Sequence, residues 1–326
     1  MRILVIGGTS FVGRHYVEAA LEAGHLVTLF NRGKTGADLF PDLERLTGDR
    51  TKTVDAIRGR TWDAAFDTSA YVPRVARMTA EALADSVPHY TFISSISVYS
   101  DFSNPGLDET GALQTLEDPG VEEVTGETYG GLKVLCENAV SEVYSRGALI
   151  IRPGIIAGPY DPTDRFTYLA ARAARSGKML VPGSLDSPLQ FIDARDLAAW
   201  SLHAMEAGIE GIYNAVAPPI TVGDVLNTAY DVAGADTKFV SIDRAFLEAH
   251  DVDPNAVNTW YLDDPDTEGN FWKVDGSKAA AVGMSFRPLI ETVRDTIEWA
   301  KTRGADYTWR AGIGEEHEAE LVEMIG

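Results

Sequence analysis

The first 23 residues constrain the fold of this 326-residue chain more than any other stretch. The β-prone run from Met1 to Ile6 leads at once into Gly7-Gly-Thr-Ser-Phe-Val-Gly13 and then into an amphipathic segment that ends near Ala23. A strand, a glycine-rich turn and a helix in this order are typical of a dinucleotide-binding turn, in which N–H groups at the helix start hold a pyrophosphate. The residues expected at the pyrophosphate are Gly7, Thr9, Ser10, Phe11, Val12 and Gly13.

The glycine pattern has one departure. In a G-x-x-G-x-x-G frame the three positions fall on Gly7, Ser10 and Gly13, so a serine replaces the middle glycine. A small hydroxyl can still donate a hydrogen bond to phosphate, so we treat the change as tolerable. An ordinary turn remains the alternative, because a glycine motif alone does not specify a cofactor.

Further strands alternate with helices along the first hundred residues. The expected strands are 24–30, 43–47, 62–67 and 89–94. This alternation predicts an α/β fold with a Rossmann-type doubly wound parallel sheet, which binds ligands at the carboxyl ends of its strands. The residues at these ends are polar: Asp49, Thr68, Ser69, Ser94 and Ser95.

The end of the second strand bears on the choice of cofactor. Proteins that bind NAD usually place Asp or Glu here, whereas this strand runs into Asn31-Arg32-Gly33-Lys34, with no acid before Asp38. A guanidinium can hold a 2′-phosphate that a carboxylate would repel, so NADP is favoured over NAD. The alternative is that Arg32 and Lys34 are ordinary surface cations and that Asn31 binds an unphosphorylated ribose.

Tyr129 and Lys133 form the strongest candidate for chemistry. They lie four residues apart in a segment predicted to be helical from about Thr128 to Ser145, so their side chains share one helix face. An ammonium beside a phenol favours the phenolate and lowers the tyrosine pKa from about 10. Taken alone, the spacing fits an ordinary amphipathic surface equally well.

Composition narrows the classes of partner. The formal net charge of -21 disfavours nucleic acid and anionic membranes, so we expect a small-molecule substrate. We find no signal peptide and no apolar run of about 20 residues. The single cysteine, Cys136, suits a reducing cytoplasm, and the scattered histidines give no metal-ligand cluster.

Five motifs, in order along nearly the whole chain, resemble the extended short-chain dehydrogenase/reductases, the NAD-dependent epimerase/dehydratase family. They are Gly7-Gly-Thr-Ser-Phe-Val-Gly13, Phe92-Ile-Ser-Ser-Ile-Ser-Val-Tyr99, Tyr129-Gly-Gly-Leu-Lys133, Arg152-Pro-Gly154 and Phe191-Ile-Asp-Ala-Arg-Asp-Leu197. Together they are specific, although no single motif would identify the family.

The resemblance implies a role for each matching residue. It implies that Tyr129 is the catalytic acid/base, that Lys133 binds the nicotinamide ribose and that Ser95 orients the substrate oxygen. Asp49 is similar to the acid that binds the adenine amino group. The segment from Pro153 to Ile156 resembles the loop beside the nicotinamide amide, and Ser69 lies at a position of cofactor contact.

Two departures limit what the resemblance implies. The sugar dehydratases of the family carry an Asp-Glu pair where this chain has Ile96 and Ser97, so dehydration by that route is not expected. The family's His-Leu-Ala-Ala segment after the fourth strand reads Asp67-Thr-Ser-Ala70 here, so the chain departs from the family at a segment that contacts the cofactor.

The regular alternation stops beyond Pro159, and the chain returns to the sheet at about 190–204. The expected units are 1–160 completed by 190–217 for dinucleotide binding, 161–189 and 218–312 for a smaller substrate domain, and 313–326 for a C-terminal helix. Arg165, Gln190 and Arg195 lie near the family's substrate contacts. Alternatively, Arg165 caps a helix and Arg195 pairs with Asp193 or Asp196.

These observations lead to two hypotheses of function. The first is a nicotinamide-dependent oxidoreductase or epimerase that transfers hydride at a secondary alcohol or ketone of a small polar substrate such as a nucleotide sugar. The second is a non-catalytic NAD(P)-binding sensor or regulator. The joint presence of Ser95, Tyr129 and Lys133 favours the enzyme. A homodimer is compatible with either hypothesis.

Overall fold

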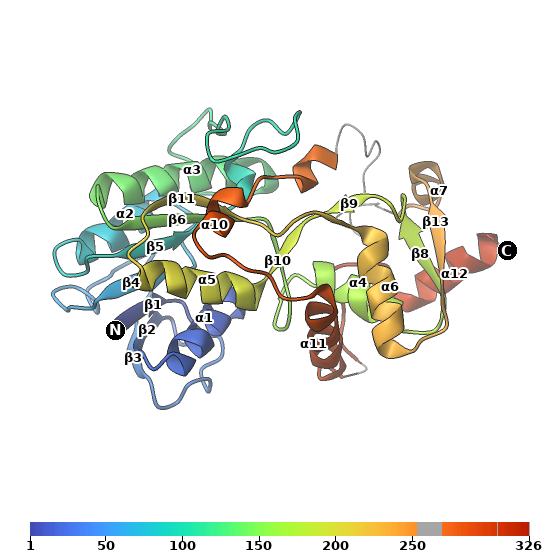
Figure 1. The fold of residues 1–326 in the computed structure, drawn as a ribbon, viewed down its shortest axis with the longest axis horizontal. Helices are drawn as coiled ribbons and strands as arrows, with labels where there is room; N and C mark the ends of the chain where they lie inside the picture. Colours follow the sequence, from blue (N-terminus) through green and yellow to red (C-terminus); the bar gives the residue numbers. More distant parts are fainter. Residues whose placement is uncertain (253–268, 305, 326) are drawn as a thin grey trace.

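The computed structural model describes residues 1–252, 269–304 and 306–325. Its N-terminal part is a parallel sheet of seven strands in the order β11-β6-β5-β4-β1-β2-β3 (Figure 1). These strands are β1 (Arg2–Ile6), β2 (Leu26–Asn31), β3 (Glu44–Thr47), β4 (Ala64–Asp67), β5 (Tyr90–Ile93), β6 (Ala148–Pro153) and β11 (Gly211–Ala215). The order reverses between β1 and β4, the position at which doubly wound sheets bind their ligands.

Helices cover both faces of this sheet. On one face α1 (Phe11–Glu22) packs beside α5 (Ala194–Glu206), and on the other α2 (Pro73–Leu83) packs beside α3 (Gly126–Val143) (Figure 1). The central strands β4 and β5 are buried along their whole length, as a parallel sheet with two covered faces requires. The predicted doubly wound α/β fold is confirmed.

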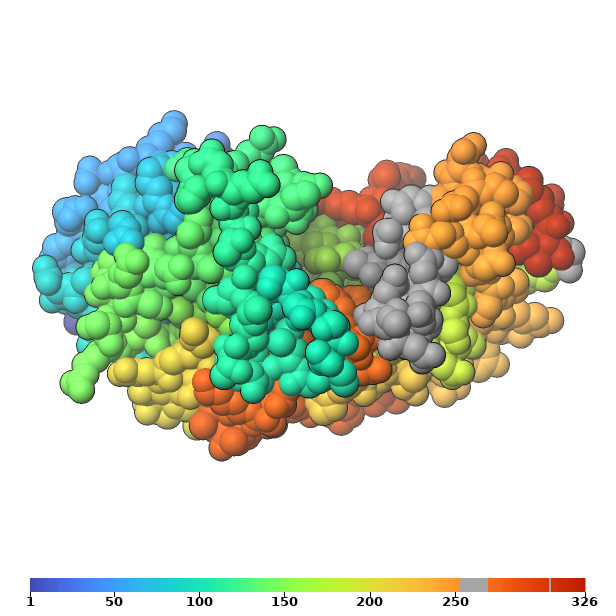
Figure 2. Space-filling model, turned by 90° about the horizontal axis from the view of Figure 1, so that it is seen from above, coloured from blue at the N-terminus to red at the C-terminus, as the bar shows by residue number. Residues whose placement is uncertain are grey.

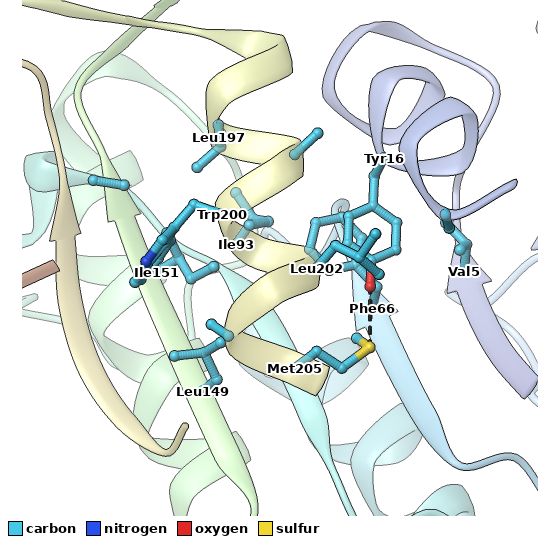
Figure 3. Close-up of a cluster of buried hydrophobic side chains, with 14 of the residues drawn as sticks. Val5, Tyr16, Phe66, Ile93, Leu149, Ile151, Leu197, Trp200, Leu202 and Met205 are labelled. Carbon is cyan, nitrogen blue, oxygen red and sulfur yellow. Dashed lines mark hydrogen bonds between the residues drawn. The ribbon is translucent and has the colours of Figure 1, made fainter. Parts of the chain in front are cut away.

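The core on the α1 and α5 face is closely packed around two aromatic rings. Tyr16 on α1 stacks on Phe66 of β4 with ring centroids 3.5 Å apart, and its hydroxyl donates to Sδ of Met205 on α5 at 3.1 Å (Figure 3). Each side chain of this size contributes about 1.5 to 3 kcal/mol when fully buried. The packing fixes α1, and with it the glycine turn that precedes α1.

The segment 190–204 departs from the expected return to the sheet. It forms the short strand β10 (Phe191–Asp193), which pairs with β7 (Ile155–Ala157) outside the seven-stranded sheet, and then α5. The carboxylate of Asp193 accepts a hydrogen bond from the Arg195 N–H and caps α5, so the strand ends after three residues. The sheet is instead completed by β11, which pairs with β6. The domain boundaries stay a prediction.

A second, smaller part of the molecule follows the sheet (Figure 1). Its larger elements are α4 (Arg165–Ala173), β8 (Gly177–Pro182), α6 (Val222–Ala233), β13 (Thr237–Ile242), α11 (Leu289–Lys301) and α12 (Glu315–Ile325). Its shorter ones are β9 (Pro188–Leu189), β12 (Ile220–Thr221), α7 (Arg244–Ala249), η2 (Gly269–Trp272) and α10 (Ser277–Ala281). Part of the expected substrate domain, 253–268, lies outside the described residues. In the described part of the chain, no helix is both long enough and apolar enough to span a bilayer.

Candidate active site

Two adjoining cavities lie at the carboxyl ends of the central strands. The outer cavity, of about 360 Å³, is lined by residues that include Gly7, Asn31, Arg32 and Asp49. The inner cavity, of about 440 Å³, is lined by residues that include Ser95, Tyr129, Lys133 and Arg165. The lining residues common to both cavities are Ser10, Thr68, Ser69 and Tyr71. The two cavities therefore form one groove along the edge of the sheet.

The face seen from above in Figure 2 is hollowed between the green segment that contains α3 and the orange and red C-terminal segments. Residues of both parts of the molecule line the inner cavity, since Phe271 of η2 joins Tyr129 of α3 there. The inner cavity therefore lies between the sheet and the smaller part.

The glycine turn before α1 forms the junction of the two cavities. Gly7 has φ +107°, and a Cβ there would approach Oγ1 of Thr68 to 2.5 Å. A Cβ at Gly13 would lie 2.8 Å from the backbone nitrogen of Gly8, because the turn and α1 are in close contact. Ser10 precedes α1 as its N-cap without a side-chain capping bond, so its hydroxyl is not used by the helix. Larger residues at these glycines would block the turn.

Asn31, Arg32 and Asp49, three polar residues of the outer cavity, keep part of their surface accessible to water. Asn31 uses its amide on the turn itself: Nδ2 donates to the Gly7 carbonyl at 2.8 Å, and Oδ1 accepts from the Gly33 N–H at 3.0 Å. Arg32 is exposed, and no ion pair of Arg32 occurs among the described residues. Asp49 accepts two hydrogen bonds from Thr51, which lower the pKa of the Asp49 carboxyl.

Local sequence explains where the catalytic helix begins. Thr125 and Thr128 form a reciprocal capping box, in which each threonine oxygen accepts a hydrogen bond from the other residue's N–H. The cap starts α3 at Gly126, so Tyr129 and Lys133 fall on consecutive turns above the sheet edge. Ser95 follows β5 and lines the same cavity as Tyr129, and its hydroxyl donates to Oγ of Ser97 at 3.0 Å. The structure thus brings the three predicted catalytic residues to one cavity.

Lys133 is almost completely buried, with 2% of its surface exposed. Its Nζ donates to the Ala70 carbonyl at 2.9 Å and to the Ile93 carbonyl at 2.8 Å, and lies 4.5 Å from the ring centroid of Phe92. Burial penalises the charged form and lowers the pKa of Lys133 to about 8. The ammonium is therefore held in place by the ends of two neighbouring segments of the sheet.

The expected effect of Lys133 on Tyr129 does not occur in this structure. The pKa of Tyr129 is raised above its usual value of about 10, first by burial and then by the neighbouring Tyr71, while nearby Ser95 and Arg165 oppose the shift. The ring centroids of the two tyrosines are 6.3 Å apart. The ammonium points to backbone carbonyls instead of the phenol, which is why the expected lowering fails.

A buried ion pair lies beneath the groove and was missed by the sequence reasoning. Arg50 donates to the Asp67 carboxylate at 2.5 and 2.7 Å, to Ser69 at 3.2 Å and to Thr79 at 3.0 Å. The hydroxyl of Tyr90 donates to the same carboxylate at 2.7 Å. Asp67 ends β4 and Arg50 follows the strand-end Asp49, so the pair joins two loops that line the outer cavity. Two charged residues next to predicted strand ends were the only signal in the sequence.

Of the three predicted substrate residues, only Arg165 lines the inner cavity. Gln190 is 2% exposed, and its side chain bonds the backbone of Ala217 and Val274, so its assignment to the substrate was wrong. Arg195 forms ion pairs with Asp193 and Asp295 beside the capped start of α5. That assignment was also wrong, and the alternative pairing with Asp193 is confirmed.

Comparison with known proteins identifies the family. The model of the "NAD dependent epimerase/dehydratase family" matches residues 3–215, which contain the glycine turn, Ser95 and the Tyr129 and Lys133 pair. The chain belongs to this family. It is accordingly an enzyme of the NAD-dependent epimerase/dehydratase type, as its resemblance to the extended short-chain dehydrogenase/reductases implied.

Individual relatives of this epimerase-family chain are distant. It is 26% identical over 236 residues to the epimerase family protein SDR39U1 of Bos taurus, a match that covers 67% of this chain and 75% of that protein. It is 27% identical over 255 residues to a chloroplast stem-loop binding protein of 41 kDa from Arabidopsis thaliana, covering 72% of this chain and 63% of that protein. The NAD complex of UDP-glucuronic acid 4-epimerase from Bacillus cereus has the same fold, with a TM-score of 0.67 and 16% identity, over 95% of this chain and all of that one.

The groove of this epimerase-family chain fits a nicotinamide dinucleotide. The turn around Gly7 and Gly13 leaves no room for side chains and presents the N–H groups at the start of α1. At the inner cavity, Ser94 and Asp161 each carry a buried oxygen with no hydrogen-bond partner among the described residues. Pro153 and Ile156, predicted to lie beside the nicotinamide, line the same cavity. A bound ligand would satisfy polar atoms that the described residues leave unpaired.

Proposed function

We propose that the chain transfers a hydride between a nicotinamide dinucleotide and a secondary alcohol or ketone of a small polar substrate, with nucleotide sugars as the substrate class. The observation that carries this proposal is the inner cavity, where Tyr129, Lys133 and Ser95 meet beside the glycine turn. A site that only held a nucleotide would not need a half-buried phenol and a buried ammonium at its inner end.

Tyr129 is the proposed acid/base. Its phenol gives a proton to the substrate oxygen during reduction and takes the proton back during oxidation, a contribution of about 10² to 10⁴ in rate. Ser95, which lines the same cavity, orients the same oxygen, and Lys133, whose Nζ donates to the Ala70 and Ile93 carbonyls, is the proposed contact of the nicotinamide ribose. The bound nicotinamide supplies or accepts the hydride.

We also propose that NADP is bound more tightly than NAD. The exposed guanidinium of Arg32 and the ammonium of Lys34 both line the outer cavity, where a 2′-phosphate would carry the matching charge. Asn31 supports the turn with its amide, which leaves the cations as the groups available for recognition. Asp49 is the proposed partner of the adenine amino group, and Ser69 lies between the two cavities.

Arg165 is the proposed contact for an anionic group of the substrate. It lines the inner cavity beside Thr163, whose hydroxyl accepts from Nε of Arg165 at 3.2 Å. A diphosphate is the anion that nucleotide sugars offer, and an arginine can bind it through paired hydrogen bonds. With Ile96 and Ser97 in place of an Asp-Glu pair, we propose reduction or epimerisation and exclude dehydration by the Asp-Glu route. NADP preference favours reduction.

The decisive experiment identifies the nucleotide and then the substrate. Nucleotide released from the purified protein is identified, and absorbance of the reduced cofactor is followed with carbonyl compounds. Epimerisation shows no net change in this absorbance, so UDP-glucose and UDP-glucuronic acid are also assayed for their epimers by chromatography. Turnover of one compound with either cofactor supports the proposal.

A nucleotide-bound protein that turns over nothing in both assays would instead favour a sensor. The Arabidopsis relative is named as a stem-loop binding protein, so a nucleic-acid stem-loop is included as a further ligand in the binding assay. The net charge of -21 opposes its binding.

A further inference from the structure

Two buried arginine–carboxylate pairs attach the C-terminal part of the chain to opposite ends of α4. At the start of α4, Arg303 pairs with Asp164. At its far end, Nε of Arg172 lies 2.5 Å from the carboxylate of Glu318 on α12. All four side chains are less than a tenth exposed. The two pairs are chemically alike, but only the first lies beside the inner cavity.

Asp164 is the centre of the first pair. Its side chain is fully buried and accepts hydrogen bonds from the guanidinium of Arg303, from the hydroxyl of Tyr307 at 2.8 Å and from the backbone N–H of Arg310 at 3.0 Å. Its φ of +63° is in the left-handed region, which Asp tolerates better than most residues but which still costs free energy. Asp164 is also the N-cap of α4, yet its side chain does not cap that helix. The Asp164 carboxylate instead accepts hydrogen bonds from residues of the C-terminal segment.

The C-terminal segment also holds the backbone of the loop before α4. Arg303 donates to the Asp161 carbonyl at 3.0 Å, and Arg310 donates to the Pro162 carbonyl at 3.2 Å. Arg303 is itself stacked between aromatic rings, 3.7 Å from the ring centroid of Trp299 and 4.4 Å from that of Tyr307. A guanidinium held by two rings and two acceptors has little freedom to move.

A continuous chain of hydrogen bonds runs from this segment to the inner cavity. Asp161, whose carbonyl is held by Arg303, accepts on Oδ1 from the N–H and hydroxyl of Thr163 at 2.8 and 2.7 Å. The Thr163 hydroxyl in turn accepts from Nε of Arg165. Asp161, Thr163 and Arg165 all line the inner cavity. The loop therefore faces substrate on one side and the C-terminal segment on the other.

We propose that Asp164 and Arg303 are positioning residues: their buried pair fixes the loop 161–165 so that Arg165 is held toward an anionic group of the substrate. This inference rests on the proposed function, because it takes the anion contact of Arg165 as given. The Arg172–Glu318 pair secures the other end of α4 and has no such effect. Specificity for an anionic substrate thus depends on a segment more than 130 residues away along the chain.

The test compares two matched, isosteric substitutions. Asp164→Asn removes the charge that pairs with Arg303 and keeps a side chain that suits the left-handed backbone. Glu318→Gln removes the corresponding charge from the other pair, whose acceptor also bonds the Leu180 N–H at 3.0 Å. UDP is titrated by calorimetry into cofactor-loaded wild type, both variants and Arg165→Ala. The midpoint of thermal unfolding and the Kd of the cofactor are measured for each protein.

We expect both isosteric variants to unfold at lower temperature, but only Asp164→Asn to bind UDP roughly tenfold more weakly, as Arg165→Ala does. The cofactor Kd should stay within about twofold in all of them, and Arg303→Lys should restore part of the affinity lost by Arg303→Ala.

Equal weakening of UDP binding by Glu318→Gln would overturn the inference, since it would reveal a general effect of stability. So would an unchanged UDP affinity in Asp164→Asn when Arg165→Ala binds weakly. If Arg165→Ala also leaves UDP binding unchanged, or wild type does not bind UDP, the proposed anion contact fails and the inference falls with it. Hydride transfer by Tyr129 is tested separately and would stand.

Discussion

The outer and inner cavities are lined by similar numbers of polar residues, but the exposure and the pKa values of their charged residues differ. In the outer cavity Arg32 is exposed, and the Asp49 carboxyl keeps a pKa on the low side of its usual range. In the inner cavity burial lowers the pKa of Lys133 to about 8 and raises the pKa of both Tyr129 and Asp161. The exposed guanidinium of Arg32 is therefore screened by water at one end of the groove, whereas the Lys133 ammonium at the other end is almost completely buried.

This difference suits the outer cavity to recognition of the cofactor and the inner cavity to proton transfer. Exposed charge pairs are worth about 0 to 1 kcal/mol unless their geometry is favourable, and paired hydrogen bonds from a guanidinium to a phosphate are such a geometry, so the outer cavity can select a cofactor through one well-placed group. Buried titratable groups exchange protons over a shifted pH range and respond strongly to a neighbouring charge. We therefore expect substitutions in the inner cavity to affect rate, those beneath the groove to affect stability, and those in the outer cavity to affect affinity.

The largest effect should come from Tyr129→Phe. Loss of the phenolic proton should lower kcat about 10² to 10⁴-fold with little change in the Kd of the cofactor, because the glycine turn and the outer cavity are untouched. Steady-state kinetics and cofactor titration measure the two quantities. Tyr71→Phe is the matched control, since Tyr71 lines the same cavity. Full activity of Tyr129→Phe would refute its role as acid/base.

Removal of the buried carboxylate beneath the groove should cost the most stability. Asp67→Ala leaves the Arg50 guanidinium buried without its partner, and we expect the free energy of unfolding to fall by about 3 to 5 kcal/mol. Tyr90→Phe removes a single hydrogen bond to the same carboxylate and should cost only about 1 kcal/mol. Urea unfolding measures both values. Similar small losses in the two variants would mean that Arg50 finds other partners.

The fold could be predicted from sequence because its signals are local. The glycine turn and the repeated apolar runs each require only neighbouring residues, and β1, β2 and β5 lie within two residues of their predicted ends. The segment 190–204, expected to return to the sheet, instead forms β10, which pairs with β7, and then α5, while β11 completes the sheet. The partner of a short strand depends on tertiary contacts, which local sequence signals do not reveal.

The sequence predicted those parts of the candidate site whose residues lie near one another along the chain. Tyr129 and Lys133 share a helix, so their proximity follows from spacing. Gln190 and Arg195 were misassigned because their partners at Val274 and Asp295 come from the far end of the chain. The Arg50–Asp67 pair was missed for the same reason, since it joins two different strand ends across the sheet.

In the outer cavity, Arg32→Ala should weaken NADPH binding by about 1.5 to 3 kcal/mol and leave NADH binding nearly unchanged. The expected contact is a charge-assisted hydrogen bond to the 2′-phosphate, a group that NADH lacks. Calorimetric titration of both cofactors measures the difference. Arg45→Ala tests for a general charge effect, because Arg45 bonds the Leu39 carbonyl and does not line the cavity. Equal loss for NADH and NADPH would remove the assignment of NADP.

The smallest effect per step of the measurement concerns the pH dependence of stability, taken one pH unit at a time. The pKa of Lys133 is about 8 in the folded protein, below the value of about 10.4 expected in the unfolded chain. Between these values the unfolded state holds more protons, so this lysine makes stability rise with pH, by at most about 1.4 kcal/mol per pH unit. Lys133→Met lacks this titration. The stability advantage of Lys133→Met over wild type should therefore shrink as pH rises from 8 to 10.

Charged and titratable residues from several helices and strands influence the pKa of Lys133, so the interpretation of the pH experiment depends on them. Burial lowers the pKa of Lys133, while Cys136, Asp67 and Glu137 oppose the shift and Arg50 adds to it. Urea unfolding of nucleotide-free wild type and Lys133→Met at several pH values isolates the lysine, with Lys301→Met as a control at an exposed position. A stability difference that stays constant from pH 8 to 10 would mean that Lys133 titrates like an exposed lysine. The contrast between the buried ammonium of the inner cavity and the exposed Arg32 of the outer cavity would then no longer hold at Lys133, the residue on which it most depends.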